Sequence, residues 1–284
     1  MKTTRKPEWL RIKIDTSGNY SKIQKIVQEN SLNTICSSGL CPNKGECWSR
    51  GTATFMILGE ICTRSCRFCA TKTGKPEECD PLEANRIAKA VSLMKLKHCV
   101  ITSVTRDDLP DEGASHWVSV IETCREKNPD TTIEVLLPDF GANKEQISKV
   151  VDTKPDIISH NIETVKRLTP ATRSKADYNT SLNALKIMAD SGLLTKSSIM
   201  LGLGETPKEV AETIKDLYNA GCRLLCIGQY LQPTRNHLPV KEYITPEQFL
   251  EYKQYSLKIG FSHVESGPLV RSSYMSENAL SIDL

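Results

Sequence analysis

Six of the eleven cysteines fall into two triplets whose spacing is suited to holding metal. The two sets are Cys36, Cys41 and Cys47, and then Cys62, Cys66 and Cys69. Structural zinc sites and cubane iron–sulfur clusters both use four ligands, so each triplet is one ligand short. A zinc site usually closes with further thiols or with histidines, but the five histidines are scattered and form no partner motif. Iron–sulfur chemistry therefore explains the triplets better than zinc.

The second triplet has the spacing Cys-x3-Cys-x2-Cys and follows directly after a predicted strand. Three thiolates can hold three corners of a [4Fe–4S] cube and leave the fourth iron open to another ligand. This spacing resembles the signature of the radical S-adenosylmethionine (SAM) superfamily, in which SAM fills the open corner. The resemblance also implies that Phe68, before the last cysteine, lies near the adenine of SAM. In such enzymes SAM yields a 5′-deoxyadenosyl radical, which the protein aims and shields.

The first triplet narrows the resemblance to the lipoyl synthase family. Both cysteine motifs and five later segments are similar to that family's landmarks, in order along nearly the whole chain. These segments are CPNKGECW (41–48), GEICTRSCRFCA (59–70), TSVTRDDLPDEGA (102–114), HNIETV (160–165), GLGE (202–205), GQYLQPTRNHLPV (228–240) and GPLVRSSY (267–274). The chain departs from the family pattern at Glu112, which replaces a usual glycine.

This resemblance implies which side chains hold the cofactors. The second triplet would bind the SAM-binding [4Fe–4S] cluster, and the first would bind an auxiliary [4Fe–4S] cluster. Ser273 of the RSSY motif would complete the auxiliary cluster, with Ser272 as the competing choice. A hydroxyl oxygen is a poor match for iron compared with thiolate, which suits a cluster that must be opened and consumed.

The same resemblance implies a reaction and its partners. Hydrogen is removed from C6 and then from C8 of an octanoyl chain amide-linked to a carrier-protein lysine, and the auxiliary cluster supplies both sulfur atoms. The product is the lipoyl cofactor, which makes the chain a sulfurtransferase. The carriers would be the E2 subunits of 2-oxoacid dehydrogenases and the H protein of glycine cleavage. A ferredoxin or flavodoxin would supply electrons, and an iron–sulfur carrier would rebuild the consumed cluster.

Polar residues at predicted strand ends are candidates for binding SAM. Thr102 and Ser103 end the second predicted strand, and Asn161 and Glu163 end the fourth, at the edge where β/α barrels bind ligands. The alternative is that these side chains only cap the strands. Two arginines are candidates for holding SAM or the carrier backbone, with surface salt bridges as the alternative: Arg173 and Arg271.

Two more segments are candidates for the cavity lining. The glycines of GLGE (202–205) would let the backbone approach the cofactor, because glycine has no Cβ. Four polar or aromatic side chains end the sixth predicted strand and would line a substrate channel: Gln229, Tyr230, Gln232 and Thr234. The remaining cysteines are expected to behave as small buried apolar residues: Cys79, Cys99, Cys124, Cys222 and Cys226.

Six strand–helix units must position these residues. Continuous apolar, β-branched-rich runs predict strands buried on both faces at 52–59, 98–104, 131–138, 155–163, 196–204 and 223–231. Helices are predicted between them at 81–97, 114–128, 143–152, 177–191 and 207–220. Capping residues followed by proline predict the helix starts at Asp80, Thr206 and Thr245. The repeats predict an α/β fold, a partial (β/α)6 TIM-like barrel of the radical SAM type.

Three regions are predicted along the chain. Residues 1–51 form an N-terminal extension that carries the auxiliary-cluster cysteines, 52–245 form the partial barrel, and 246–284 form a C-terminal extension with the RSSY motif. The two extensions are expected to flank the barrel without joining its repeating strand–helix pattern.

Composition limits the other classes of function. A net charge of +3 with mixed signs argues against a nucleic-acid-binding protein. No apolar run reaches the length of a membrane span, and the basic N-terminus lacks the apolar core of a secretion signal. We therefore expect a cytoplasmic protein without nucleic-acid or membrane partners.

Two alternatives stay open from the sequence. Another two-cluster radical SAM enzyme, such as a methylthiotransferase, would typically carry an added RNA-binding module, and none is visible after residue 245. A ferredoxin-like carrier or a zinc-stabilised binding protein would not require a barrel of this size. Iron and sulfide counting separates the second alternative from an enzyme.

Overall fold

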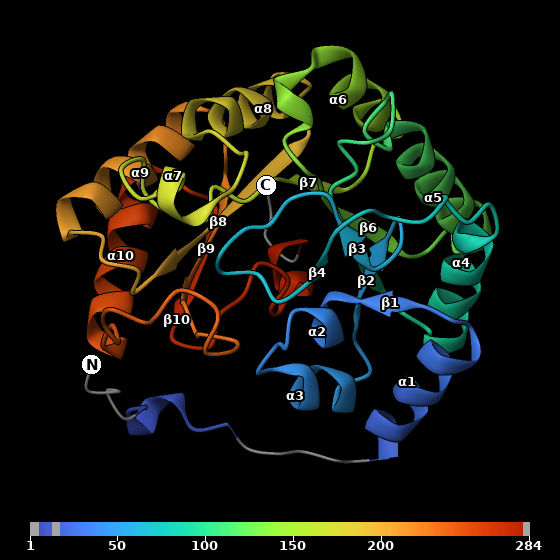
Figure 1. Ribbon diagram of the computed structural model, residues 1–284, viewed down its shortest axis with the longest axis horizontal. Coiled ribbons are helices and arrows are strands. Elements are labelled where there is room, and N and C mark those ends of the chain that lie inside the picture. The colour runs from blue at the N-terminus through green and yellow to red at the C-terminus, as the bar shows by residue number, and fades with distance from the viewer. Residues whose placement is uncertain (1–5, 13–17, 281–284) are drawn as a thin grey trace.

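Seven parallel strands form the main sheet, and one short antiparallel strand pairs with its first edge (Figure 1). The computed structural model describes residues 6–12 and 18–280. Within these residues the strand order is β1-β2-β5-β6-β7-β8-β9-β10, with β1 and β10 at the two open edges, so the sheet is a partial barrel. The strands are β1 Asn33–Thr34, β2 Thr54–Ile57, β5 His98–Ser103, β6 Thr132–Leu136, β7 Ile157–Ser159, β8 Leu194–Leu201, β9 Leu224–Gln229 and β10 His263–Gly267.

Helices follow the parallel strands and form an outer ring around the sheet (Figure 1). They are α4 Glu83–Met94, α5 Ala114–Lys127, α6 Lys144–Val151, α8 Tyr178–Asp190, α9 Pro207–Asn219 and α10 Pro246–Ile259. Every residue of β2 and β9 is buried, which explains why these strands read as continuous apolar runs rather than alternating ones. The six predicted strands, the five predicted helices and the predicted fold class are confirmed.

The helix starts agree with two of the three capping predictions. Thr206 and Glu209 form a reciprocal capping box at the start of α9. At α10 the side chain of Thr245 accepts a hydrogen bond from Gln248 N. The prediction at Asp80 is wrong, because α4 begins only at Glu83 and Asp80 accepts from Leu82 N instead.

The C-terminal region joins the barrel, which corrects the expectation that it flanks the barrel. Helix α10 returns the chain to β10, which pairs in parallel with β9 as a seventh parallel strand. The predicted boundary at residue 245 therefore does not separate the sheet from the region after it. After β10, the 3-10 helix η3 (Ser276–Leu280) lies within the ring of strands, where Ala279 packs with Ile157 and Leu224 (Figure 1).

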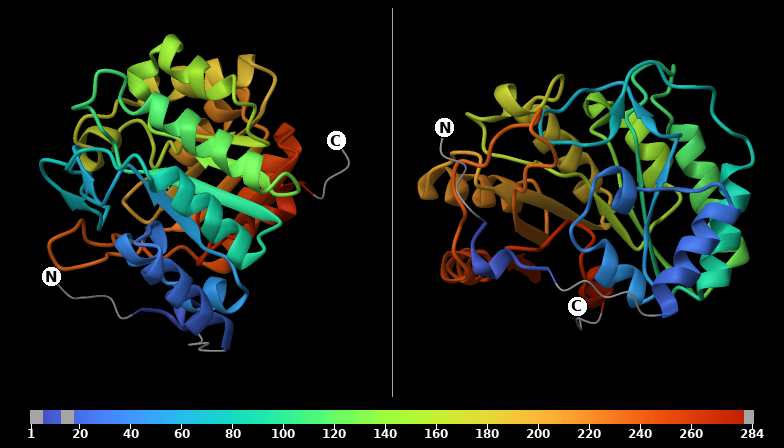
Figure 2. Two further views of the ribbon diagram at one scale, coloured as in Figure 1. Left: turned by 90° about the vertical axis from the view of Figure 1, so that its right-hand side faces the viewer. Right: turned by 60° about the horizontal axis from the view of Figure 1, so that its bottom comes forward.

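The N-terminal region covers the open side of the barrel. It contains η1 (Glu8–Leu10), α1 (Gly18–Glu29), β1, α2 (Ile35–Ser38) and α3 (Lys44–Ser49). Its strand β1 pairs with β2. Figure 2 shows α2 and α3 close to the C-terminal segment, although the two are more than 200 residues apart in sequence (Tyr274 lies 228 residues from Glu46). Residues 1–5, which hold most of the basic N-terminal run, lie outside the described residues.

A small two-stranded sheet frames the second cysteine triplet. Strands β3 (Ile61–Cys62) and β4 (Lys72–Thr73) pair in parallel; Cys62 ends β3, and the loop to β4 carries Cys66 and Cys69. Two short helices lie beside this loop at the same end of the barrel: η2 (Phe140–Ala142) and α7 (Thr169–Thr172).

Candidate functional site

The first cysteine triplet is held by the short helices of the N-terminal region. Cys36 is buried in α2, whose N-terminus is capped by Thr34. The Cys41 N–H donates to Cys36 O at 3.1 Å, so the chain turns back between these two thiols. Cys47 lies in α3, and its N–H donates to Asn43 O at 2.9 Å. Two short helices thus place three thiols around one space.

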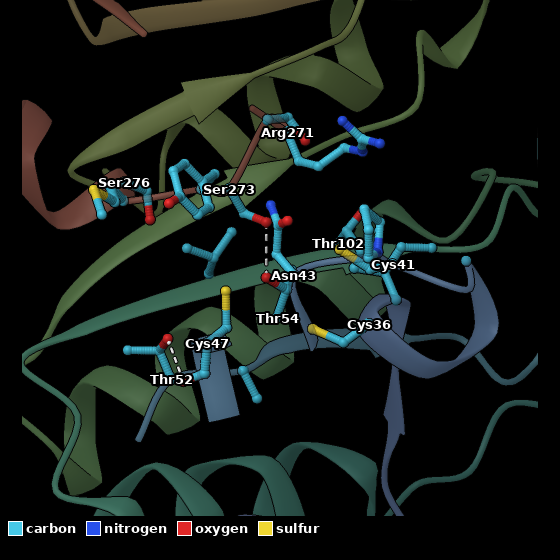
Figure 3. Close-up of a pocket in the computed structure, with 18 of the residues that line it drawn as sticks. Cys36, Cys41, Asn43, Cys47, Thr52, Thr54, Thr102, Arg271, Ser273 and Ser276 are labelled. Atoms are coloured by element: carbon cyan, nitrogen blue, oxygen red, sulfur yellow. Dashed lines mark hydrogen bonds between the residues drawn. The ribbon is translucent and has the colours of Figure 1, made fainter. Parts of the chain in front are cut away.

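Ser273 reaches the same space from the other end of the chain (Figure 3). Thr54 Oγ1 donates to Ser273 Oγ at 2.9 Å, which joins β2 to the RSSY segment. Asn43 Nδ2 donates to Leu269 O at 2.6 Å. Tyr274 donates to Glu46, and Arg50 pairs with Glu277, so four side-chain contacts fasten the two segments together. Ser272 also lines the cavity, and its backbone oxygen accepts from the Cys226 thiol.

Burial and crowding raise the pKa of two thiols of the first triplet, Cys41 and Cys47. Burial and the nearby Cys36 raise the pKa of Cys41, against which Arg271 acts in the opposite direction. Burial and the neighbouring Cys36 and Cys41 raise the pKa of Cys47 to about 12. Thiolates need a compensating positive charge here, and metal ions provide one.

The second triplet is placed at the C-terminal end of β2 and held through its backbone. The N–H groups of Arg64 and Thr105 donate to Cys62 Sγ at 3.4 and 3.3 Å. Burial raises the pKa of Cys66 and of Cys69, and the neighbouring Cys62 raises both further. All three thiols line one cavity. The loop is fixed from outside as well, because Arg67 N donates to Thr172 O at 2.8 Å.

A cavity of about 160 Å³ opens beside the second triplet. It is lined by all three cysteines of the triplet and by all six residues predicted to bind SAM, namely Phe68, Thr102, Ser103, Asn161, Glu163 and Arg173. Three buried polar atoms in this lining have no hydrogen-bond partner among the described residues: Ser103 Oγ, Asn161 Oδ1 and Arg173 Nε. Buried polar atoms are normally paired, so these three atoms fit a polar ligand in the cavity.

Two of the predicted SAM contacts also have structural partners. Thr102 Oγ1 donates to Leu136 O at 3.1 Å, so its hydroxyl already serves the sheet. Glu163 has a φ of 68° and forms an isolated bridge with Ile199, which turns the chain after β7 into the cavity. Burial raises the pKa of Glu163, although Arg173 acts in the opposite direction.

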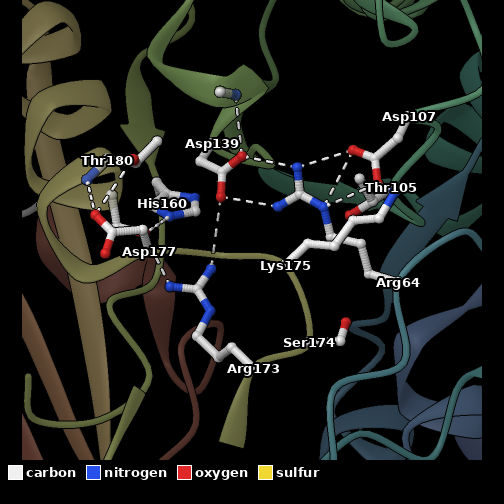
Figure 4. Close-up of polar contacts among 12 residues, drawn as sticks. Arg64, Thr105, Asp107, Asp139, His160, Arg173, Ser174, Lys175, Asp177 and Thr180 are labelled. Atoms are coloured by element: carbon white, nitrogen blue, oxygen red, sulfur yellow. Dashed lines mark hydrogen bonds and ion pairs between the residues drawn. The ribbon is translucent and has the colours of Figure 1, made fainter. Parts of the chain in front are cut away.

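A network of charged residues, most of it buried, forms part of the wall of this cavity (Figure 4). Arg64, from the cysteine loop, forms hydrogen bonds with Asp107 and with Asp139 at 2.8 to 3.1 Å. Arg173 lies 3.9 Å from Asp139 and donates to Ser181 Oγ at 2.8 Å. The network connects the cysteine loop to the ends of β5 and β6 and to α8.

A larger cavity of about 940 Å³ reaches both triplets. It is lined by the three cysteines of the first triplet and by Ser273, and also by Phe68 and Cys69 beside the second triplet. Seven residues line both cavities: Ile35, Phe68, Cys69, Thr102, Leu136, Asn161 and Glu163. A ligand in the larger cavity would therefore touch the surroundings of both triplets.

The channel candidates after β9 divide into two groups. Gln229, Tyr230 and Gln232 line the larger cavity. Thr234 does not appear in the lining of either cavity; it is exposed and forms a hydrogen bond with His237. Arg271 is also in the larger cavity, beside Cys41, and therefore near the first triplet rather than the second.

The GLGE segment serves the fold rather than the cofactor cavity, which corrects that candidate. Gly202 has a φ of 101°, and a Cβ there would overlap Gln229 Nε2 and Glu242 O. Gln229 in turn donates to Leu201 O, Tyr230 O and Glu242 O and accepts from Ile244 N. Gly202 thus allows the backbone to approach the buried amide of Gln229, whose hydrogen bonds hold the loop after β9 in place.

Four of the five remaining cysteines are buried as predicted: Cys99, Cys124, Cys222 and Cys226. Cys79 is the exception. It is only half-buried, and its sulfur accepts a hydrogen bond from Arg106 Nη1 at 3.4 Å.

Comparison with known proteins agrees with this geometry. The family model "Radical SAM superfamily" matches residues 56–217. A lipoyl synthase from Bacteroides fragilis is 58% identical over 97% of this chain and 96% of its own length. A lipoyl synthase from Treponema denticola is 55% identical over 96% of this chain and 94% of its own length. The chain belongs to the lipoyl synthase family.

Solved structures of other proteins share the fold of this lipoyl synthase family member. Methylornithine synthase (PylB) superposes with a TM-score of 0.58 at 11% identity, over 90% of this chain and 87% of that one. Streptococcus suis SuiB bound to S-adenosylmethionine superposes with a TM-score of 0.60 at 12% identity, over 89% of this chain and 63% of that one. At these identities the likeness concerns the fold.

As a lipoyl synthase family member, the chain is a radical SAM enzyme with [4Fe–4S] clusters and SAM as cofactors. The donor sets fit these groups, because each triplet offers three soft thiol ligands around one cavity. No three Cys, His, Asp or Glu side chains gather for a single metal ion within residues 6–12 and 18–280. In a cubane each iron takes its own protein ligand, so the thiols that hold a cluster do not converge on one ion.

Several site residues of this lipoyl synthase family member were not predicted from the sequence. Three of them lie inside recognisable motifs in which only the cysteines and the strand-end residues suggest a role: Asn43, Arg64 and Asp107. Asp139 lies just after a predicted strand, at the edge where ligands bind, which was the available signal.

None of the helices in the described part of the chain has the length and apolar character of a membrane-spanning helix.

Proposed function

We propose that this chain inserts two sulfur atoms, at C6 and C8, into an octanoyl chain that is amide-linked to a lysine of a lipoyl carrier protein. The observation that carries this proposal is that the two cysteine triplets line two cavities, and that these cavities have seven lining residues in common. A single elongated substrate in the larger cavity can approach both sites. Hydrolysis or acyl transfer would need neither of them.

The ligand assignment follows from the two donor sets. Cys62, Cys66 and Cys69 would hold the SAM-binding cluster. Cys36, Cys41, Cys47 and Ser273 would hold the auxiliary cluster. When bound, these groups supply hydrogen-atom abstraction by SAM and sulfur from the auxiliary cluster. Ser273 is favoured over Ser272 because its hydroxyl is already drawn toward the site by Thr54.

The chain itself aims and shields the substrate. Asn161, Glu163 and Arg173 offer polar groups in the lining of the smaller cavity, with Phe68 placed to stack on an aromatic base. Met200, Tyr230 and Leu231 contribute apolar surface to the larger cavity, which suits an acyl chain and excludes water. The carrier would enter where the lining of the larger cavity is half-buried or exposed.

The partners follow from the substrate. As a lipoyl synthase family member, the chain acts on lipoyl carrier proteins. We infer that these are octanoylated E2 subunits of 2-oxoacid dehydrogenases and the glycine cleavage H protein, with ferredoxin or flavodoxin as electron donor and an iron–sulfur carrier for cluster rebuilding. A cytoplasmic location and the absence of nucleic-acid or membrane partners stay predictions from the sequence.

One experiment tests the activity. Anaerobically reconstituted protein is incubated with SAM, a reductant and an octanoylated carrier domain, and the carrier is weighed by mass spectrometry. A gain of two sulfur atoms with a loss of two hydrogens is expected. An unchanged carrier, or methylthiolated RNA in a parallel incubation, would reject the proposal.

A further inference from the structure

Asp139 occupies a buried position between the cysteine loop and the cofactor cavity (Figure 4). It follows β6 and caps η2, where its carboxylate accepts from Gly141 N at 3.1 Å. Its side chain is only 2% exposed. A carboxylate so deeply buried needs charged partners, and it has one arginine from each of two separate segments.

The first partner is Arg64, which lies between Cys62 and Cys66 in the chain. Arg64 Nη1 and Nη2 donate to the two oxygens of Asp139 at 2.8 and 2.9 Å, a bidentate arrangement. The opposite edge of the guanidinium is taken by Asp107, at 2.8 to 3.1 Å. Because both edges are occupied, Arg64 has one orientation, and the cysteine loop around it is held to β6.

The second partner is Arg173, whose Nη2 lies 3.9 Å from Asp139 Oδ2. Arg173 Nη1 donates to Ser181 Oγ at 2.8 Å. His160 accepts from Ser181 through Nε2 at 3.1 Å and donates through Nδ1 to Leu137 O at 2.9 Å, which is the tautomer of a neutral ring. Burial, followed by the charge of Arg173, lowers the pKa of His160 to about 4, so this ring is neutral at physiological pH.

Arg173 lines the cofactor cavity and keeps one buried donor without a partner among the described residues. Arg173 Nε has no hydrogen-bond partner among the described residues, although the side chain is 7% exposed. The same side chain lines the cavity beside Cys66 and lowers the pKa of that thiol, after burial has raised it. A fixed cation with a free donor in this place suits a carboxylate.

We propose that Asp139 is a positioning residue that sets Arg173 against the carboxylate of bound SAM, while holding Arg64 and the cysteine loop in the matching register. Asp139 lines the same cavity, but both of its carboxylate oxygens accept from Arg64, so its role toward SAM is exerted through the two arginines. The inference rests on the proposed function only in that SAM occupies the smaller cavity. Nothing in it depends on the identity of the octanoyl substrate.

The substitution Asp139→Asn keeps the size of the side chain and removes its charge. An amide can accept from one Arg64 nitrogen, but its NH2 group opposes the other, and it no longer attracts Arg173. In the reconstituted two-cluster protein, we expect the dissociation constant of SAM to rise by about 10- to 100-fold, with iron and sulfide contents unchanged. The constant is read from the change in the EPR spectrum of the reduced cluster as SAM is added.

Asp108→Asn is the matched control. Asp108 also accepts two hydrogen bonds from one arginine, Arg106, at 2.9 Å each, in the loop after β5. It is exposed and lines neither cavity. SAM affinity is expected to stay within about twofold of the wild-type value in this variant.

A double-mutant cycle decides whether Asp139 acts through Arg173. In the Arg173→Met background, adding Asp139→Asn should change SAM affinity by less than about twofold, because the group being positioned is already gone. If Asp139→Asn weakens SAM binding equally in both backgrounds, or leaves it unchanged in the wild type, the proposal is wrong.

A second readout covers the case in which Asp139→Asn does not fold. Ser181→Ala removes the hydrogen bond to Arg173 and keeps the ion pair with Asp139, so it should weaken SAM binding less than Asp139→Asn but measurably. Unchanged SAM affinity in a folded Ser181→Ala protein would count against the proposal. These affinities are independent of product formation: a wild-type chain that makes no lipoyl group but shows this pattern would reject the proposed function and leave the positioning role standing.

Discussion

At the auxiliary site, one hydroxyl faces three thiols. Ser273 is held toward this site by Thr54 at 2.9 Å, and it comes from a segment that is half-buried and fastened by four side-chain contacts. Oxygen binds the irons of a sulfur-ligated cube less strongly than thiolate does. With the ligand set that we propose, the auxiliary cluster would have one corner that opens more readily than the others.

Replacing that oxygen by sulfur should trap the cluster. We expect Ser273→Cys to retain auxiliary iron and sulfide during turnover and to slow sulfur transfer by about tenfold or more, because a thiolate corner opens less readily. Single-turnover product formation and iron counting measure both effects. Ser272→Cys is the control and should leave both unchanged, whereas trapping by Ser272→Cys instead would assign the ligand to the neighbouring serine.

Glu112 departs from the family pattern, in which a glycine is usual at this position. It has a φ of 52°, a conformation in which the family's usual glycine is favoured. Its Oε2 is buried without a hydrogen-bond partner among the described residues. Burial raises the pKa of Glu112, and the nearby Arg64 only partly offsets this.

The raised pKa gives a stability prediction with a defined sign. An acid whose pKa is higher in the folded state destabilises that state once the pH exceeds its ordinary value, and has no such effect below it. Glu112→Gln should therefore raise the melting temperature of the cluster-free chain at neutral pH. The gain should shrink as the pH falls toward the ordinary glutamate pKa of 4.5. A gain that is independent of pH would show that the carboxylate charge is not the cause.

At the scale of elements, one glycine allows the C-terminal segment to pack closely against strand β9. Gly228 of β9 is paired in register with Gly267 of β10. A Cβ on Gly228 would overlap the carbonyl oxygen of Val270, immediately before Arg271 and the two serines. Close backbone approach, rather than an unusual φ, requires glycine here.

Gly228→Ala should displace the RSSY segment. We expect a loss of about 1–3 kcal/mol of stability and loss of the auxiliary cluster, with the SAM-binding cluster retained, because only the former uses Ser273. Urea unfolding and iron counting test this. Gly267→Ala is the matched control, since a Cβ there would meet only Val270 Cγ2 at 3.5 Å, an ordinary contact. Equal damage from both substitutions would contradict the steric explanation.

At the scale of the whole molecule, a buried ion pair spans the barrel interior beneath the site. Lys196 Nζ of β8 lies 2.7 Å from Glu134 Oε1 of β6, and the residues are 3% and 1% exposed. His98 Nε2 of β5 lies 3.4 Å from Glu134 Oε2. Burial alone would raise the pKa of Glu134, but Lys196 lowers it overall, so the stability from this carboxylate is present above its ordinary pKa and is lost on acidification.

Lys196→Met should leave Glu134 buried without its main partner. We expect a loss of about 3–5 kcal/mol in the free energy of unfolding, measured by urea titration at neutral pH. The double substitution Lys196→Met with Glu134→Leu should recover most of that loss, because it removes the uncompensated charge as well. If the double variant is no more stable than the single one, lost packing rather than the unpaired charge explains the effect.

The sequence by itself determined six of the seven parallel strands in the described residues, the five helices between those six strands, and the two sets of thiols. Buried parallel strands are continuous apolar runs, and ligand spacing within a loop is set by the local chain, so both are readable without tertiary structure. Asp80 does not cap α4, because the Glu83 side chain points inward and accepts hydrogen bonds from Leu58 N and His116.

Only the tertiary structure decided what completes each site. Ser273 reaches the first triplet because β10 joins the sheet and returns the chain through the barrel interior, and Asp139 meets Arg64 and Arg173 because β6 ends beside the cysteine loop. These partners are separated by 34 to more than 200 residues, and no local pattern links them. Their meeting depends on strand order and on the burial of charge, and both belong to the folded chain as a whole.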